Sequence, residues 1–185
     1  MKRSTKIAVA IAASLGLGAA AAAFAAGPAP SPYAGEQRRE IKALSGKDVQ
    51  DLLAGRGMGL AKAAELNRYP GPAHVLELAD RLGLSAEQKA RTQSVFDAME
   101  ARARALGKAL VEREAELDRL FASRRISRDS LQSSLAGISR LQGELRRVHL
   151  EAHLAQTDIL TREQVASYAQ LRGYGGAGHS AEHRH

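Results

Sequence analysis

The sequence predicts an all-α fold, a long antiparallel helical hairpin with short flanking helices. Apolar residues recur in alternating three- and four-residue steps along two stretches, 86–124 and 128–159, as in helices that pack on one another. A short link joins the stretches, so the two helices should run antiparallel. Aromatic residues make up 4% of the chain and Trp is absent. A core built mainly from Ala and Leu favours elongated helices over a deep globule.

The chain begins like a secretory signal peptide. Residues 1–6 are basic, residues 7–24 are uncharged and rich in Ala, and Ala23-Phe24-Ala25 matches a signal cleavage site. We therefore expect residues 1–25 to be removed on export to the periplasm, with Ala26 as an alternative end point. An uncleaved membrane anchor is the competing interpretation, but a stretch of mostly Ala and Gly is weakly apolar for a permanent span.

The composition restricts the kinds of site and partner. The chain has no Cys, which excludes disulfides and thiolate metal sites. Loss of Lys2, Arg3 and Lys6 with the signal lowers the formal net charge from +7 to +4. A mildly basic exported protein is expected to meet acidic or unfolded protein segments, or envelope lipids, and no nucleic acid. Motifs of nucleophilic or nucleotide-dependent enzymes are absent from the sequence, so we expect no enzyme and no required cofactor.

Short elements precede the hairpin. Residues 26–44 contain Pro and Gly followed by charges, which is typical of a flexible arm that becomes helical towards its end. Ser45 and Asp48 predict the cap of a short helix that ends near Gly55. The Gly-rich run 55–59 resembles a phosphate loop, but no strand precedes it and no Lys-Ser/Thr pair follows. A helix–helix turn is therefore favoured.

Turn residues delimit the other elements. The expected elements are helices over 59–67, 72–83 and 162–172 and a disordered, His-rich tail over 174–185. The folded domain is expected over 45–173. The hairpin interior is expected to contain Phe96, Met99, Ala103, Leu106, Leu110, Arg113, Leu117 and Leu120 on the first helix, and Leu131, Leu135, Ile138, Leu141, Leu145, Val148, Ala152, Ala155 and Ile159 on the second. Gly107 should lie level with Gly143, which suggests a close backbone approach or a bend there.

Two pentads, LSAEQ at 84–88 and LTREQ at 160–164, each predict a helix start. Ser85 and Thr161 are the expected N-caps, because their hydroxyls can accept a backbone N–H that the first turn leaves unpaired. The side chains of Gln88 and Gln164, three residues later, can reach back and accept the backbone N–H of the cap residue, which completes a capping box. The residues before the caps, Leu84 and Leu160, stand where a hydrophobic staple begins.

This combination of export signal, missing Cys, helical hairpin and paired L-[ST]-x-x-Q boxes resembles the Spy/CpxP family of periplasmic proteins. The resemblance covers roughly residues 73–173, and the metal-responsive periplasmic resistance proteins are relatives of that family. It implies a cradle-shaped antiparallel homodimer that shields unfolded or stressed envelope proteins without ATP. It also implies that a membrane sensor kinase or sigma-factor regulator could be a partner, and that one branch binds metal through His and carboxylates.

A metal site is the sharper alternative. His149 and His153 are four residues apart on one predicted helix, so their rings face the same side. His74 and Glu77 form a second one-face pair, which could lie within about one helical turn (5.4 Å) of the first. Zn, Ni, Co and Cu favour such imidazole donors. The competing interpretation is that these residues are partly buried polar side chains beside the seam, the apolar stripe along which the two long helices pack. The tail residues His179, His183 and His185 could bind metal only weakly.

The leading functional hypothesis is thus an ATP-independent, chaperone-like envelope-stress protein, and the alternative is a periplasmic heavy-metal sensor or resistance protein. Arg102 and Arg146 represent the cationic surface of the hairpin and are candidate client-binding residues. A flexible amphipathic surface suits promiscuous binding. A solvated helix face with alternating charge is the plainer interpretation of the same pattern.

Overall fold

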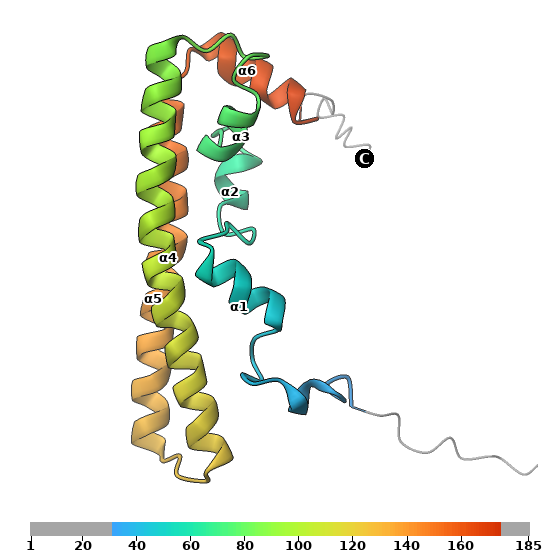
Figure 1. Cartoon of the computed structure of the whole chain (residues 1–185), viewed down its shortest axis with the longest axis vertical. Coiled ribbons are helices and arrows are strands. Elements are labelled where there is room, and N and C mark those ends of the chain that lie inside the picture. Colours follow the sequence, from blue (N-terminus) through green and yellow to red (C-terminus); the bar gives the residue numbers. More distant parts are fainter. Residues whose placement is uncertain (1–30, 175–185) are drawn as a thin grey trace, which may run out of the picture. The chain divides into compact units, whose positions relative to one another are not determined.

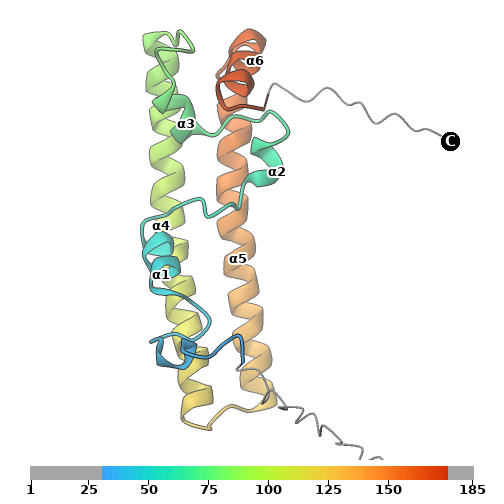
Figure 2. The ribbon, with the colours of Figure 1, turned by 90° about the vertical axis from the view of Figure 1, so that its right-hand side faces the viewer.

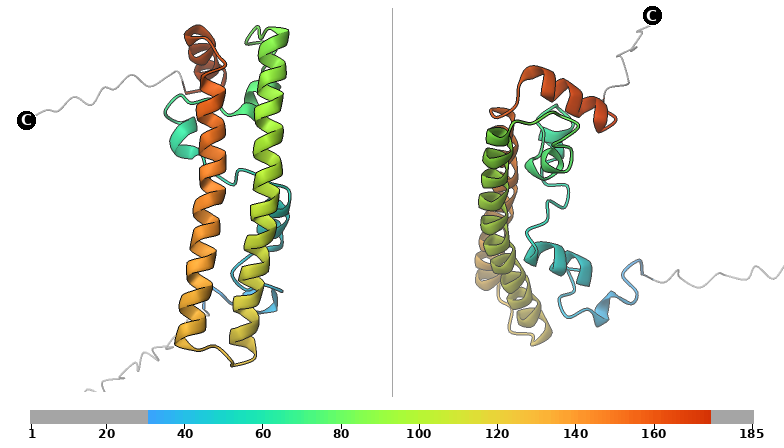
Figure 3. Two further views of the ribbon diagram at one scale, coloured as in Figure 1. Left: turned by 90° about the vertical axis from the view of Figure 1, so that its left-hand side faces the viewer. Right: turned by 45° about the horizontal axis from the view of Figure 1, so that its top comes forward.

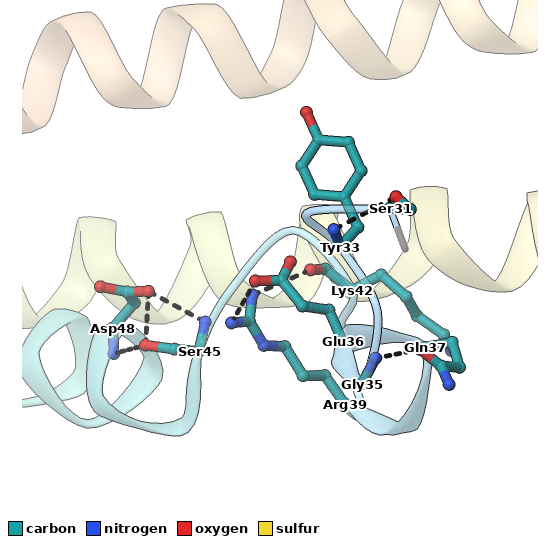
Figure 4. A network of polar contacts seen from close by, with 9 residues as sticks. All are labelled: Ser31, Tyr33, Gly35, Glu36, Gln37, Arg39, Lys42, Ser45 and Asp48. Carbon is teal, nitrogen blue, oxygen red and sulfur yellow. Dashed lines mark hydrogen bonds and ion pairs between the residues drawn. The ribbon is translucent and has the colours of Figure 1, made fainter. Parts of the chain in front are cut away.

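The computed structural model describes residues 31–174, and the chain divides into two compact units, Met1–Ala34 and Gly35–His185. The predicted signal peptide and the predicted His-rich tail from residue 175 lie outside the described residues. The described end of the first unit is a turn. Ala34 donates its backbone N–H to the Ser31 carbonyl (2.9 Å), and Tyr33 donates its own to the Ser31 hydroxyl (3.2 Å; Figure 4).

The second unit is helical, and no strand occurs among residues 31–174, so the predicted all-α class is confirmed. Its elements are the 3-10 helix η1 (Glu36–Arg38) and the helices α1 (Gly46–Leu53), α2 (Lys62–Glu65), α3 (Pro72–Glu77), α4 (Ala86–Ala122), α5 (Arg128–Thr157) and α6 (Arg162–Leu171). Within this described part, none of the helices combines the length and apolar character that crossing a membrane requires.

The long helices α4 and α5 lie side by side and antiparallel (Figures 1 and 2). The short helices α1, α2 and α3 follow one another along one face of this pair (Figure 3). Helices α1 and α3 pack on α4, while α2 packs on α5, so this segment crosses between the two long helices. We call residues 39–77 the strap. Helix α6 follows the end of α5 and packs through Tyr168 and Leu171 near α3.

The interior of the α4–α5 pair contains most of the residues that the periodicity predicts. The buried cluster comprises Leu52, Ala103, Leu110, Ile138, Leu141, Leu145 and Val148. Each large aliphatic side chain buried there stabilises the fold by about 1.5–3 kcal/mol. Towards the turn between the helices the seam is less covered. Leu135 is 46% exposed, and the polar break Arg113 is exposed.

Gly107 permits a close approach, but to a different partner from the one expected. A Cβ atom at this position would collide with the Leu52 carbonyl group, lying 2.7 Å from its carbon atom. Gly143, by contrast, is exposed, and a Cβ there would meet nothing within 4 Å. Gly107 therefore admits the C-terminal end of α1 onto α4. The close approach expected between Gly107 and the second helix at Gly143 is replaced by the approach of α1, because the strap packs on this side of α4.

Part of the expected arm belongs to the second unit. Ile41 is buried at 6% exposure, and Lys42 pairs with Asp118 of α4 at 3.0 Å. Figure 4 shows the polar contacts nearby. There Arg39 pairs with Glu36 at 2.8 Å, and Ser45 and Asp48 form the capping box of α1. The compact unit thus begins before residue 45, because one apolar side chain in the charged segment finds a buried position.

Candidate metal-binding cavity

A cavity of about 280 Å³ lies between the strap and the half of the α4–α5 pair that is nearer α6. All four residues predicted as metal ligands line it: His74 and Glu77 from α3, and His149 and His153 from α5. The Gly-rich loop after α1 forms part of the wall, so this run serves as a helix–helix turn in the structure. The strap thus brings together two residue pairs that stand far apart in the sequence.

His149 is buried at 4% exposure, and its Nε2 atom has no hydrogen-bond partner among residues 31–174. Burial, and secondarily the neighbouring His153, lowers the pKa of His149 below its ordinary value of 6.5. The ring is therefore neutral at neutral pH, which is the form that binds a metal ion. An unpartnered buried polar atom costs about 1–3 kcal/mol, so this nitrogen calls for an explanation.

His153 is also buried, and its tautomer follows from its neighbour. Its Nδ1 atom lies 2.7 Å from the Tyr69 carbonyl oxygen, which can only accept a hydrogen bond. Nδ1 therefore carries a proton, which in the neutral tautomer leaves the lone pair on Nε2. Such a backbone contact is the usual way in which a metal-binding imidazole is oriented. Gly71 is required beside this ring, because a Cβ there would lie 3.0 Å from Nε2.

His74 and Glu77 occupy the opposite wall and contact each other. His74 Nδ1 lies 3.0 Å from Glu77 Oε2, and the two side chains are 40% and 66% exposed. Among residues 31–174, no three His, Cys, Asp or Glu side chains are arranged to hold one ion. The structure therefore brings the four predicted residues to one cavity but not into one coordination shell.

Two carboxylates at this site were missed by the sequence argument. Glu100 of α4 lines the cavity and pairs with Arg104 at 3.3 Å. Glu65 of α2 is only 13% exposed. Its Oε2 atom is buried 3.8 Å from His153 Nδ1 and has no hydrogen-bond partner in the described part of the chain. Neither residue carries a local signal, because both stand among ordinary helix-forming charges and gain their role from the folded strap.

The two pentads form the expected capping boxes and also contact each other. Ser85 and Thr161 accept the backbone N–H groups of Gln88 and Gln164, and each Gln side chain accepts its cap's N–H. The two Gln side chains exchange amide hydrogen bonds of 2.8 and 3.1 Å. Each also donates to a backbone carbonyl, Gln88 to Ile159 and Gln164 to Leu82. The pentads thereby join the start of α4 to the start of α6. Leu84 is buried and Leu160 is half-buried.

The two arginines proposed for client binding line different grooves. Arg102 pairs with Glu151 across the α4–α5 pair at 3.4 Å, in a small hollow lined by Val95, Ala98 and Ala155. Arg146 lines a groove of about 540 Å³ beside α1, together with Leu44, Met58 and Leu60 of the strap. The two residues therefore border separate hollows of the described structure.

Comparisons of the chain with protein-family models, with curated proteins and with solved structures find no match in any of the three.

Proposed function

We propose that this protein is an exported metal-binding protein that holds Zn, Ni, Co or Cu in the cavity between the strap and the α4–α5 pair. The observation that supports this most directly is the buried His149 Nε2 atom without a partner, beside a second buried imidazole in the same cavity. A metal ion would satisfy that nitrogen. The function is that of a heavy-metal sensor or resistance protein, which the paired L-[ST]-x-x-Q boxes also favour through their resemblance to the Spy/CpxP family.

The donor set suits a borderline metal. Two imidazoles underfill a tetrahedral shell, so a third ligand is needed, and His74, which lines the same cavity, is the candidate that would add a third imidazole. Glu77 or Glu100 is a candidate fourth donor. Oxygen donors alone would suit Mg or Ca, whereas this mixture of imidazole and carboxylate suits Zn, Ni, Co or Cu.

Calorimetric titration of the mature protein with each of the four metals tests the site. His149→Ala and His153→Ala should each abolish tight binding, and His74→Ala should weaken it. Affinity should fall below about pH 6.5, because a ligand imidazole must be neutral. Deletion of residues 175–185 is the matched control and should remove only weak, additional equivalents. Normal binding by the His149/His153 double variant, together with loss of all binding on tail deletion, would refute the cavity site.

Shielding of unfolded or stressed envelope proteins is the second candidate function, and two apolar grooves beside α1 favour it. One, of about 570 Å³, lies between the start of the strap and α4, and the other, of about 540 Å³, lies between the strap and α5. Leu44 lines both, and Met58 at the second is 43% exposed. Open apolar grooves with arginines at the edge suit loosely structured chains.

An aggregation assay with an unfolding client tests the shielding function. Arg146→Glu, at the edge of the second groove, should weaken protection, and added salt should do the same if charge steers capture. Arg102→Glu is the matched control, because Arg102 lies outside the two grooves beside α1. Equal protection by wild type and Arg146→Glu at every salt concentration would show that this charge is incidental.

The same family resemblance supports a cradle-like hairpin that forms an antiparallel homodimer, with a membrane sensor kinase or sigma-factor regulator as a further partner. Light scattering of the mature protein tests the dimer, and a monomer across the micromolar range would contradict it. Crosslinking in the periplasm with and without added metal tests the signalling partner.

A further inference from the structure

Glu65 stands between the candidate metal site and helix α6. Its side chain comes from the short helix α2 and is 13% exposed. One carboxylate oxygen, Oε2, faces His153, at 3.8 Å from the ring Nδ1 atom. This oxygen is buried and has no hydrogen-bond partner among the described residues. Glu65 is not among the cavity-lining residues that are candidate donors to the metal ion.

The other carboxylate oxygen, Oε1, is hydrogen-bonded to α6 and to the residues that follow it. It accepts hydrogen bonds from the Tyr168 hydroxyl at 2.6 Å, the Tyr174 hydroxyl at 3.2 Å and the Arg172 Nε atom at 3.3 Å. Tyr168 is 1% exposed, and burial together with Glu65 raises its pKa, so its hydroxyl stays protonated and donates. Three donors from α6 and the residues after it thus converge on one atom of α2.

Occupation of His153 by a metal ion would change the electrostatics at Glu65. A cation on Nε2 withdraws electron density from the ring and makes the Nδ1–H group a stronger, more positive donor. A carboxylate on that side of the ring stabilises the bound state, and the effect is large because the pair is shielded from water. The same attraction keeps Glu65 in place, and with it the acceptor that α6 needs.

We propose that Glu65 is a positioning residue that couples metal binding at His149 and His153 to the docking of α6 and residues 172–174. This inference rests on the metal-binding function proposed above. The coupling is positive: the metal ion strengthens the docking of α6, and docked α6 strengthens metal binding, because a coupling free energy is reciprocal. The segment that enters the C-terminal tail thereby responds to metal occupancy.

Zinc titration of the full mature chain tests the first half of the coupling. Glu65→Gln keeps the shape of the side chain and removes its charge. It should weaken Zn²⁺ binding several-fold. The loss is smaller than the roughly 10- to 100-fold effect of removing a hydrogen-bonded partner, because the Tyr69 carbonyl and not Glu65 accepts the Nδ1–H of His153. Asp80→Asn is the matched control, because Asp80 is an exposed carboxylate paired only with Lys89 at 2.8 Å, and its zinc affinity should equal that of wild type.

Hydrogen exchange of the α6 amides tests the second half. Added Zn²⁺ should slow exchange in residues 165–174 of wild type and should have no such effect in Glu65→Gln. Tyr174→Phe removes one donor to Glu65 at a half-buried position and leaves the histidines untouched. By reciprocity it should weaken Zn²⁺ binding several-fold. A purely structural role for Tyr174 would leave zinc affinity unchanged.

The outcomes separate this inference from the function on which it rests. Equal zinc binding by wild type and by His149→Ala would refute the metal site itself. Histidine-dependent binding that Glu65→Gln leaves unchanged, with the same zinc-dependent protection of α6, would overturn the coupling and leave the site standing. If Glu65→Gln does not fold, Tyr174→Phe decides, and unchanged zinc affinity in that variant overturns the coupling.

Discussion

The α4–α5 pair buries different kinds of side chain in its two halves, one near the turn between the helices and the other near α6. In the half nearer the turn at 123–127 the buried side chains are aliphatic, for example Leu110, Ile138 and Leu141. The half nearer α6 buries apolar residues too, such as Val148 and Ala152, but it also contains the buried polar or charged residues of the described chain, which are Thr92, His149, His153 and Gln156. Gln156 donates to the Thr92 hydroxyl at 3.1 Å, yet its Oε1 atom has no partner.

This difference shows where the molecule forgoes stability. An aliphatic side chain contributes about 1.5–3 kcal/mol when it is buried, whereas an unpartnered polar group costs about 1–3 kcal/mol. Apolar side chains at the four buried polar positions would have completed the apolar interior of the half nearer α6. Buried polar residues that weaken a core are expected at functional sites. The half of the pair nearer α6 is also where the strap and the long helices enclose the cavity lined by His149 and His153.

The largest expected effects come from exchanging side chains between the two kinds of interior. Leu141→Ala in the apolar half should lower the free energy of unfolding by about 2–5 kcal/mol. His149→Leu in the polar half should cost less than about 1 kcal/mol or stabilise the fold, because it removes an unpartnered nitrogen. Urea unfolding measures both. A loss for His149→Leu as large as that for Leu141→Ala would show that the imidazole is a structural part of the core.

The next prediction concerns how α1 covers the apolar half. Gly107→Ala should destabilise the fold by about 1–3 kcal/mol, because its Cβ would collide with the Leu52 carbonyl group. Gly143→Ala on the facing helix is the matched control and should stabilise by up to about 1 kcal/mol, since Ala favours the helix and nothing lies near. Thermal or urea unfolding of the pair measures this difference. Similar values for the two variants would argue against close packing of α1 on α4.

A smaller effect is expected at the pentads that close the polar half. Thr161→Ala should cost about 1 kcal/mol by removing the cap of α6, and Thr161→Ser should cost little. Gln164→Ala should cost more than Thr161→Ala, because it also removes the hydrogen bonds to Gln88 and Leu82. Thermal melts rank the three variants, and equal losses for Ala and Ser at position 161 would contradict the capping role.

The smallest predicted effect is a pH dependence that belongs to the polar half alone. The pKa of His149 is lowered in the folded state, so the unfolded chain binds more protons as the pH falls. Its contribution is therefore absent well above pH 6.5, and stability is lost as the pH falls from 6.5 towards the lower folded pKa. Comparing urea midpoints at pH 7.5 and 5.5 for wild type and His149→Leu isolates this effect. An unchanged pH slope in the variant would assign the dependence to other groups.

The sequence predicted most of the regular structure. The N-caps Ser45, Ser85 and Thr161 stand where the structure has them, and the seam of α5 from Ile138 to Val148 is buried as its period indicates. It also predicted that His149 and His153 share one face. The short helices are shorter than expected, since α2 covers only Lys62–Glu65 and α3 ends at Glu77. Turn residues rather than apolar periodicity determine where such short helices end, so their ends are the hardest to predict from the sequence.

What the sequence determined by itself is local: a cap joins residues three apart, and a helical seam repeats every three or four residues, so both are visible in the chain. What only the tertiary structure decided is where the strap lies. That choice places Leu52 against Gly107, faces Glu65 towards His153, and brings Tyr168 to a carboxylate 103 residues away. No period links such residues. They meet because the short helices bury their few apolar side chains against α4 and α5, and their polar neighbours are carried along.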